Sequence, residues 1–261
     1  MKATFASVLT TTPTLPSRSA LASAARALLP DLALDWRESP AGLTLELDGA
    51  TAKVVAVPGP VPNAEADTSA FLSLSAVNGR WRLGRHAAHL ALCLEGPMQV
   101  KAGGLLGRLS GETRAATRLE RLSAFTRVVA VVTKAAGGLG VHWAAGPVTH
   151  SPEFFLEVAQ QASLPLPLWI GVSLTPEPGG RTSLLSFGMA QVSLPDLLLV
   201  GPSADLADTV DFFFSALATI AEREQAPEEG ETIARSLLSR PRVTWVSSPV
   251  EAGVRVWKLE L

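Results

Sequence analysis

The apolar pattern of this chain changes many times between the two-residue period typical of strands and the period of about 3.6 residues typical of helices. Most strand candidates stand in pairs around short turn sequences, such as Asp48-Gly49 and the segment 177–180 (EPGG). Strands joined in this way are antiparallel neighbours. We therefore expect an α+β fold in which helices pack on one face of mostly antiparallel sheets.

The same pattern predicts the order of the elements. Helices are expected where apolar residues recur at spacings of three and four after a capping residue. These segments are 16–29, a short stretch from about Ala64, 111–138, 151–163 and 203–224. Strands are expected at 4–12, which should be buried, and at 32–38, 41–49, 51–59, 86–96, 138–146, a hairpin within 165–192, 242–248 and 253–261.

The order of elements repeats weakly, because each half of the chain has a strand, a helix, paired strands and another helix. No repeat of individual residues accompanies it. The glycine-rich segment 96–111 lies between the halves, and its apolar content is not typical of a free tether. We therefore expect two weakly related α+β halves, residues 1–105 and 106–261, that share an interface in one integrated body.

The charge of the chain gives no sign of a nucleic-acid partner. The formal net charge is −2, and a protein that binds phosphate backbones normally has a basic patch. The nearest feature to such a patch is Arg80, Arg82 and Arg85 around Trp81, which we interpret as a solvated face. We expect no nucleic acid among the partners.

The chain also lacks the features of a membrane or exported protein. It has no run of about 18 apolar residues, so no spanning helix is expected. The first 17 residues are interrupted by serine and threonine, which favours a strand over a signal peptide. Cys93 is the only cysteine and stands among apolar neighbours, which indicates a structural thiol. We expect a cytoplasmic protein with no membrane partner.

The segment 140–155 (GVHWAAGPVTHSPEFF) is the strongest candidate for a site. His142 and His150 could serve a hydrolase or a zinc centre if they converged with a carboxylate such as Glu153. Ordinary folding roles account for more of the residues in this segment, because Ser151 suits a helix N-cap and Pro152 suits the first helical position. The structural interpretation is favoured, and His142, His150 and Glu153 remain weak catalytic candidates.

The other histidines do not suggest a metal centre. His86 and His89 are three residues apart, which places them on opposite faces of a strand. A single cysteine cannot build a thiolate cage. The chain also lacks a P-loop, GxGxxG, GxSxG, HExxH and CxxC. We therefore expect no metal and no cofactor.

Six segments in order resemble a bacterial family. They are VAVPGPVPNAEA, AAHLALCL, GVHWAAGPVTHSPEFF, LPLWIGVSL, SFGM and EGETI. Together they are similar to the family called domain of unknown function 4261, over roughly residues 3–257. The resemblance implies a fold family and a bacterial, cytosolic setting, and it brings no established activity and no catalytic residues. After SFGM, that family continues with a second Phe-Gly pair and acidic residues on the next strand, whereas this chain keeps only Asp196.

Three classes of function remain open. The absence of catalytic signatures favours a non-enzymatic module that binds another protein, such as an immunity or accessory protein of a bacterial toxin or secretion system; this rests on analogy. One alternative is a metal-independent hydrolase-type enzyme. The other is a small-molecule sensor with a pocket between the two halves, lined by tryptophans.

Overall fold

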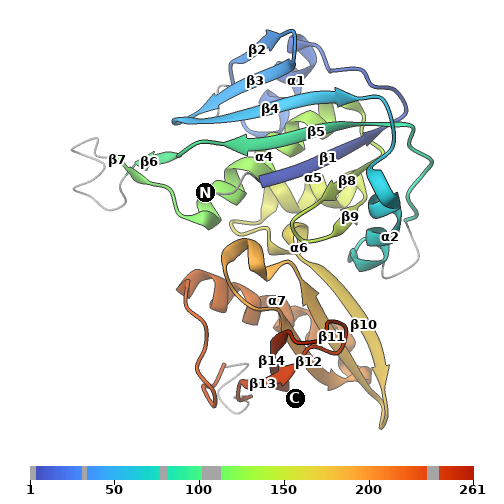
Figure 1. Ribbon diagram of the computed structural model, residues 1–261, viewed down its shortest axis with the longest axis vertical. Helices are drawn as coiled ribbons and strands as arrows, with labels where there is room; N and C mark the ends of the chain where they lie inside the picture. Colours follow the sequence, from blue (N-terminus) through green and yellow to red (C-terminus); the bar gives the residue numbers. More distant parts are fainter. Residues whose placement is uncertain (1–3, 31–33, 77–80, 102–112, 234–240) are drawn as a thin grey trace.

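The hairpin-linked strands fold as the sequence predicts, into an α+β structure with largely antiparallel sheets. The structure is a computed structural model that describes residues 4–30, 34–76, 81–101, 113–233 and 241–261 (Figure 1). Two main sheets lie one above the other in the view of Figure 1, and the chain passes from the first to the second between β9 and β10.

The first sheet has seven strands, all paired antiparallel, in the order β2-β3-β4-β5-β1-β8-β9. Their bounds are β1 Thr4–Thr10, β2 Trp36–Ser39, β3 Gly42–Leu47, β4 Ala50–Val57, β5 Ala88–Glu95, β8 Gly140–Trp143 and β9 Val148–His150. β1 is paired on both sides, which confirms that the first strand is an interior one. β9 was not expected, because the sequence indicated a loop before the helix cap at Ser151.

Three helices cover one face of this sheet: α1 (Arg18–Leu28), α4 (Arg118–Ala136) and α5 (Pro152–Gln161) (Figure 1). Each begins at a predicted type of cap, Ser17, Thr117 or Ser151, whose hydroxyl accepts a backbone N–H of the first turn. α4 is shorter than expected, because its capping box at Thr117 starts the helix there and Thr113–Ala115 forms a strand, β7.

α4 packs against α1, α5 and β1, so it buries apolar residues on most of its circumference. Phe125 and Val129 are fully buried and belong to the same core as Val8, Leu90 and Leu92 of the sheet. Packing on several sides explains why this helix has apolar residues beyond a single stripe.

The opposite face of the sheet is covered only at one end by described elements. There, η1 (Pro62–Ala64), α2 (Glu65–Ser69) and η2 (Ala70–Leu72) lie where a short helical stretch is expected from about Ala64. Leu9, Val61 and Ala66 form a second, small core beneath α2. Further along this face no described helix lies over the middle of β4, β5 and β1 (Figure 1).

The second sheet has five strands in the order β10-β11-β12-β14-β13. Their bounds are β10 Gly171–Glu177, β11 Arg181–Phe187, β12 Leu197–Pro202, β13 Thr244–Ser247 and β14 Arg255–Glu260. The predicted hairpin between β10 and β11 is present, and the β12–β14 pair is parallel. The helices of this part are α6 (Leu166–Trp169), η3 (Met189–Val192), η4 (Ser203–Asp205) and α7 (Leu206–Arg223).

The two sheets share one core rather than forming separate bodies. A single cluster of buried apolar side chains includes Val8 and Leu92 of the first sheet together with Leu184 and Trp257 of the second. The seven-stranded sheet takes β8 and β9 from beyond residue 106, so the sheets do not divide at the boundary expected there. Of the expected connecting segment 96–111, residues 102–111 lie outside the described residues. Within the described part, Gln99–Lys101 forms β6 and pairs with β7.

Candidate functional site

His142 and His150 lie on adjacent strands and on opposite faces of the seven-stranded sheet. In the β8–β9 register His142 is opposite Thr149, and His150 is opposite Val141. Because neighbouring residues of a strand point to opposite faces, the two imidazoles extend in opposite directions. The structure therefore does not bring the two candidate histidines into one site.

His150 is fully buried and both of its ring nitrogens have partners. Its Nδ1 lies 2.6 Å from Ser73 Oγ, and its Nε2 lies 3.3 Å from the carbonyl oxygen of Leu168. A carbonyl only accepts, so Nε2 carries the proton and Nδ1 accepts from the Ser73 hydroxyl. Burial lowers the pKa of His150 to about 3, so the ring is neutral at physiological pH. Neither nitrogen is left to act as a base.

Glu153 lies apart from both histidines, on the exposed side of the first turn of α5. Among the described residues, no hydrogen bond or ion pair joins its carboxylate to His142 or His150. The cap beside it is formed as expected, since Ser151 Oγ accepts from the backbone N–H of Phe154 at 3.1 Å. Glu153 lies in the first turn of α5, where its negative charge interacts favourably with the positive end of the helix dipole.

His142 lies in a buried polar cluster beneath α2. Its Nδ1 is 3.0 Å from Thr149 Oγ1 and 3.2 Å from Ser69 Oγ, and these two hydroxyls are 2.7 Å apart. Its Nε2 has no hydrogen-bond partner and lies 3.9 Å from Glu65 Oε2. Burial lowers the pKa of His142, while the Glu65 carboxylate partly raises it. The ring is therefore held mainly by two hydroxyls.

Ser69, His142 and Glu65 stand in the order of a hydroxyl nucleophile, a base and a carboxylate. The Ser69 side is closed to substrate, because the residue is only 4% exposed and its hydroxyl is shared with Thr149. The 3.9 Å gap to Glu65 also exceeds a hydrogen bond. In this arrangement the cluster anchors α2 on the sheet. Sequence reasoning missed Ser69 and Glu65, because nothing in the chain relates them to a histidine more than 70 residues later.

The remaining histidines lie near the same end of the sheet. His89 belongs to β5 and its Nδ1 is 2.8 Å from the carbonyl oxygen of Gly59. His86 precedes the strand, so the alternation expected between His86 and His89 does not extend to it. Electrostatic interaction with His86 and His89 lowers the pKa of His142. Within the described ranges, no group of three or more His, Cys, Asp or Glu side chains is arranged to hold a metal ion.

Cys93 is half-buried on the face of the sheet opposite α4, where its Sγ lies 3.6 Å from Glu95 Oε1. Burial and the neighbouring carboxylate raise the pKa of this thiol. Lys53 is nearby, but its Nζ pairs with Glu95 Oε2 at 2.6 Å. The protonated thiol is a weak nucleophile.

Asp196 supports a tight connection between β11 and β12. Its Oδ1 accepts from Ser186 Oγ at 2.9 Å and from the backbone N–H of Met189 at 3.1 Å. Burial raises the pKa of this carboxyl group. The one acidic residue that the chain keeps after SFGM thus binds its own backbone and holds the connection in place.

The part of the first sheet that described helices leave uncovered has an apolar centre. We call this surface, formed by Phe5, Ser7, Val55, Ala91 and Cys93, the open sheet face. Phe5 is 53% exposed and Val55 42% exposed, although both stand on interior strands. Phe5 pairs with Cys93, and Val55 pairs with Ala91, so their side chains form one continuous surface across β1, β5 and β4.

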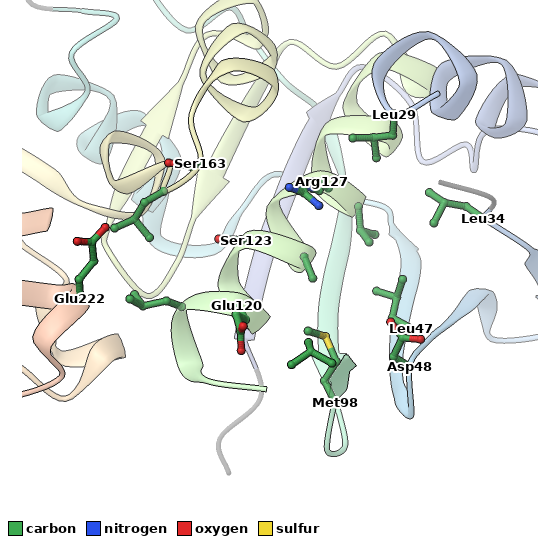
Figure 2. A pocket seen from close by; sticks show the side chains of 15 residues that line it. Leu29, Leu34, Leu47, Asp48, Met98, Glu120, Ser123, Arg127, Ser163 and Glu222 are labelled. Atoms are coloured by element: carbon green, nitrogen blue, oxygen red, sulfur yellow. The ribbon is translucent and has the colours of Figure 1, made fainter. Parts of the chain in front are cut away.

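A cavity of about 480 Å³ lies beside α4 on the other side of the sheet (Figure 2). We call it the leucine pocket, because leucines are its commonest lining residues. Its lining is Leu29, Leu34, Leu47, Asp48, Met98, Val100, Leu119, Glu120, Ser123, Ala124, Arg127, Val128, Ser163, Leu164 and Glu222. Glu222 belongs to α7, so both parts of the chain contribute. The tryptophans expected in such a pocket are not among these residues.

Two further expectations from the sequence concern a nucleic-acid partner and a membrane partner. Arg82 and Arg85 are exposed and Trp81 is half-buried, while Arg80 lies outside the described residues. Of the helices in the part of the chain that the structure describes, none combines the length and apolar character needed to cross a membrane.

Comparisons with protein-family models, with curated proteins and with solved structures find no match to this chain. The similarity of its motifs to the family called domain of unknown function 4261 therefore stays a prediction.

Proposed function

We propose that this chain is a non-enzymatic, cytoplasmic module that binds another protein through the open sheet face. The observation behind the proposal is the exposure of Phe5 and Val55 at the centre of a sheet whose other face is packed with helices. Large apolar side chains that are both exposed and contiguous are typical of interaction surfaces.

The free energy available from covering Phe5 and Val55 matches that of a binding hot spot. Burying a whole Phe or Val side chain stabilises by about 1.5–3 kcal/mol. Phe5 and Val55 are each about half exposed, so covering both would contribute roughly 1.5–3 kcal/mol. A contribution of this size is characteristic of the few residues that dominate an interface. The Lys53–Glu95 ion pair borders the patch and supplies a polar rim.

The partner segment that fits this face is an amphipathic helix. The opposite face of the same strands already packs α4 against residues of similar size, such as Val8 and Leu92. Interior strands have no free backbone hydrogen-bonding edge, so a partner strand cannot extend the sheet at this point. A helix with an apolar stripe matches a sheet face through side chains alone.

The candidate residues give weaker support to an enzyme. Both nitrogens of His150 are used, Glu153 contacts neither candidate histidine, and Ser69 beside His142 is buried. By analogy with other bacterial α+β proteins that lack catalytic signatures, the partner is a toxin or a component of a secretion system. This would make the chain an immunity or accessory protein.

A paired substitution tests the proposed surface. Val55→Glu places a charge on the open sheet face, and Val250→Glu places the same charge at a 63% exposed valine between β13 and β14. A partner isolated with the wild-type protein should also bind Val250→Glu, and its affinity for Val55→Glu should fall at least about tenfold. Equal affinity for both variants would contradict the proposal.

Cys93 provides an independent measurement, because it is the only thiol in the chain and lies in the patch. Its rate of alkylation by iodoacetamide should fall when the partner is bound. An unchanged rate at saturating partner would place the interface elsewhere.

A further inference from the structure

One side of the leucine pocket is a stripe along α4. Glu120, Ser123, Ala124, Arg127 and Val128 follow the spacing i, i+3, i+4, i+7 and i+8, so they share one face of the helix. Apolar side chains from other elements form the facing wall. The pocket thus lies between a helix and the strand ends. Its volume of about 480 Å³ is in the usual range of small-molecule sites.

The walls of this pocket are aliphatic. Leu34, Leu47, Met98, Leu119 and Leu164 line it, and no aromatic ring is among its lining residues. Flexible aliphatic walls suit a saturated chain better than a flat ring, since a ring gains most from stacking on another ring.

Arg127 is the one cationic side chain among the lining residues of the pocket. Its side chain is exposed, and within the described residues no hydrogen bond or ion pair engages its guanidinium. Arg127 and Leu29 also line a second hollow of about 330 Å³, so these side chains border both cavities. Guanidinium groups bind carboxylates with two parallel hydrogen bonds.

Three carboxylates also line the pocket, but each differs from Arg127 in its location or in its hydrogen bonds. Glu120 is held by Arg114, at 2.6 and 2.8 Å, and by the backbone N–H of Thr117. Asp48 and Glu222 are exposed and lie toward the two outer ends of the pocket, while Arg127 lies between them (Figure 2). Between these two ends, the charged lining side chain that has no partner within the described residues is therefore that of Arg127.

We propose that the leucine pocket binds a linear amphiphile with one anionic headgroup, of the chemical class of a medium-chain fatty acid. The carboxylate pairs with Arg127 and accepts from the Ser123 hydroxyl, one turn away on the same helix face. The alkyl chain lies along Leu34, Leu47 and Met98. This site is separate from the open sheet face, because the sheet lies between them.

Three probes that share a ten-carbon chain test the headgroup by calorimetric titration: decanoate, decanol and decyltrimethylammonium, the two ions below their micellar concentrations. Decanoate should bind about tenfold or more tightly than decanol, because it gains a charge-assisted hydrogen bond. The cation should bind most weakly. Equal affinity for decanoate and decanol, or a preference for the cation, would overturn the proposal.

Variants then assign the binding to the pocket. Arg127→Gln should remove the preference for decanoate over decanol, and Arg26→Gln, at an exposed arginine of α1, should leave it unchanged. Ala124→Phe should fill the pocket and abolish binding of all three probes, with its melting curve showing that it folds. Decanoate binding that survives both Arg127→Gln and Ala124→Phe would refute the site. Val55→Glu should bind decanoate normally, so failure of one proposal leaves the other intact.

Discussion

The buried imidazole of His150 is the most direct test of whether the segment 140–155 is structural. From the sequence, His150→Ala is expected to change stability little if the ring is exposed in a loop. The ring is instead fully buried in β9, between Ser73 and the carbonyl oxygen of Leu168. The structure therefore predicts a large loss of stability.

The magnitude follows from two effects. Removing a large buried side chain leaves a cavity, which costs about 2–5 kcal/mol. The same change leaves the Leu168 carbonyl without the His150 donor, at about 1–3 kcal/mol if it finds no new partner, whereas the Ser73 hydroxyl still has Ser75 Oγ at 2.7 Å. Partial relaxation reduces the sum, and we expect about 3–5 kcal/mol. This is a large share of the 5–15 kcal/mol that usually stabilises a protein.

The pH dependence gives a second signature of the same ring. Its pKa is about 3 when folded and about 6.5 when exposed. Between these values the unfolded chain binds the extra proton, so this contribution to stability is complete above about pH 7 and is lost as pH falls from 6.5 toward 3. At about pH 4.5, two pH units below the unfolded pKa, the loss is about 2.7 kcal/mol.

Urea denaturation of the wild type and His150→Ala at about pH 7.5 measures the first effect. The same measurement on the wild type and His150→Gln, at about pH 7.5 and pH 4.5, measures the second. Glutamine retains a donor and an acceptor but does not titrate in this range. The wild type should lose about 2.7 kcal/mol more than His150→Gln between the two pH values. If both proteins lose the same free energy of unfolding, or if His150→Ala is as stable as the wild type, the structural role assigned to this ring is refuted.

Three further predictions concern folding roles near the candidate residues, each measured by urea denaturation. Ser151→Ala should cost about 0.5–2 kcal/mol through loss of the α5 cap, and no change would show that the cap is dispensable. Phe155→Ala should cost about 3–5 kcal/mol because the ring is fully buried, and half-buried Phe154→Ala should cost clearly less; the reverse order would contradict the packing. Asp196→Asn should be tolerated because the amide oxygen still accepts from Ser186 and Met189, whereas Asp196→Ala should cost about 1–3 kcal/mol, and equal losses would indicate that the charge itself matters.

Elements with local signals could be predicted from the sequence. The N-cap at Ser151 and the turn at residues 177–180 lie where expected, because these structures depend on hydrogen bonds and dihedral angles within a few residues. β9 and α6 were missed. Each has only three or four residues, too few to show a period, and tertiary packing holds them in place.

The candidate site was harder to predict, because its geometry depends on pairing between distant segments. Sequence spacing placed His142 and His150 near each other, and only the β8–β9 register shows that they face opposite sides. Their hydroxyl partners, Ser69 and Ser73, come from the segment around α2, far earlier in the chain. No local pattern relates these residues, so neither polar cluster could be found without the fold.

Gly146, at the end of the strand expected over residues 138–146, is required for a long-range contact. A Cβ at this position would lie 1.6 Å from the backbone oxygen of Trp169 and would require the main chain to move. The nearby amide of Gln191 donates to that same oxygen at 2.8 Å. We therefore expect Gly146→Ala to separate the segments that join the two sheets and to lower the melting temperature by several degrees. Gly84→Ala, where a Cβ meets no atom within 4 Å, should melt like the wild type. If both variants melt alike, this contact does not hold the two sheets together.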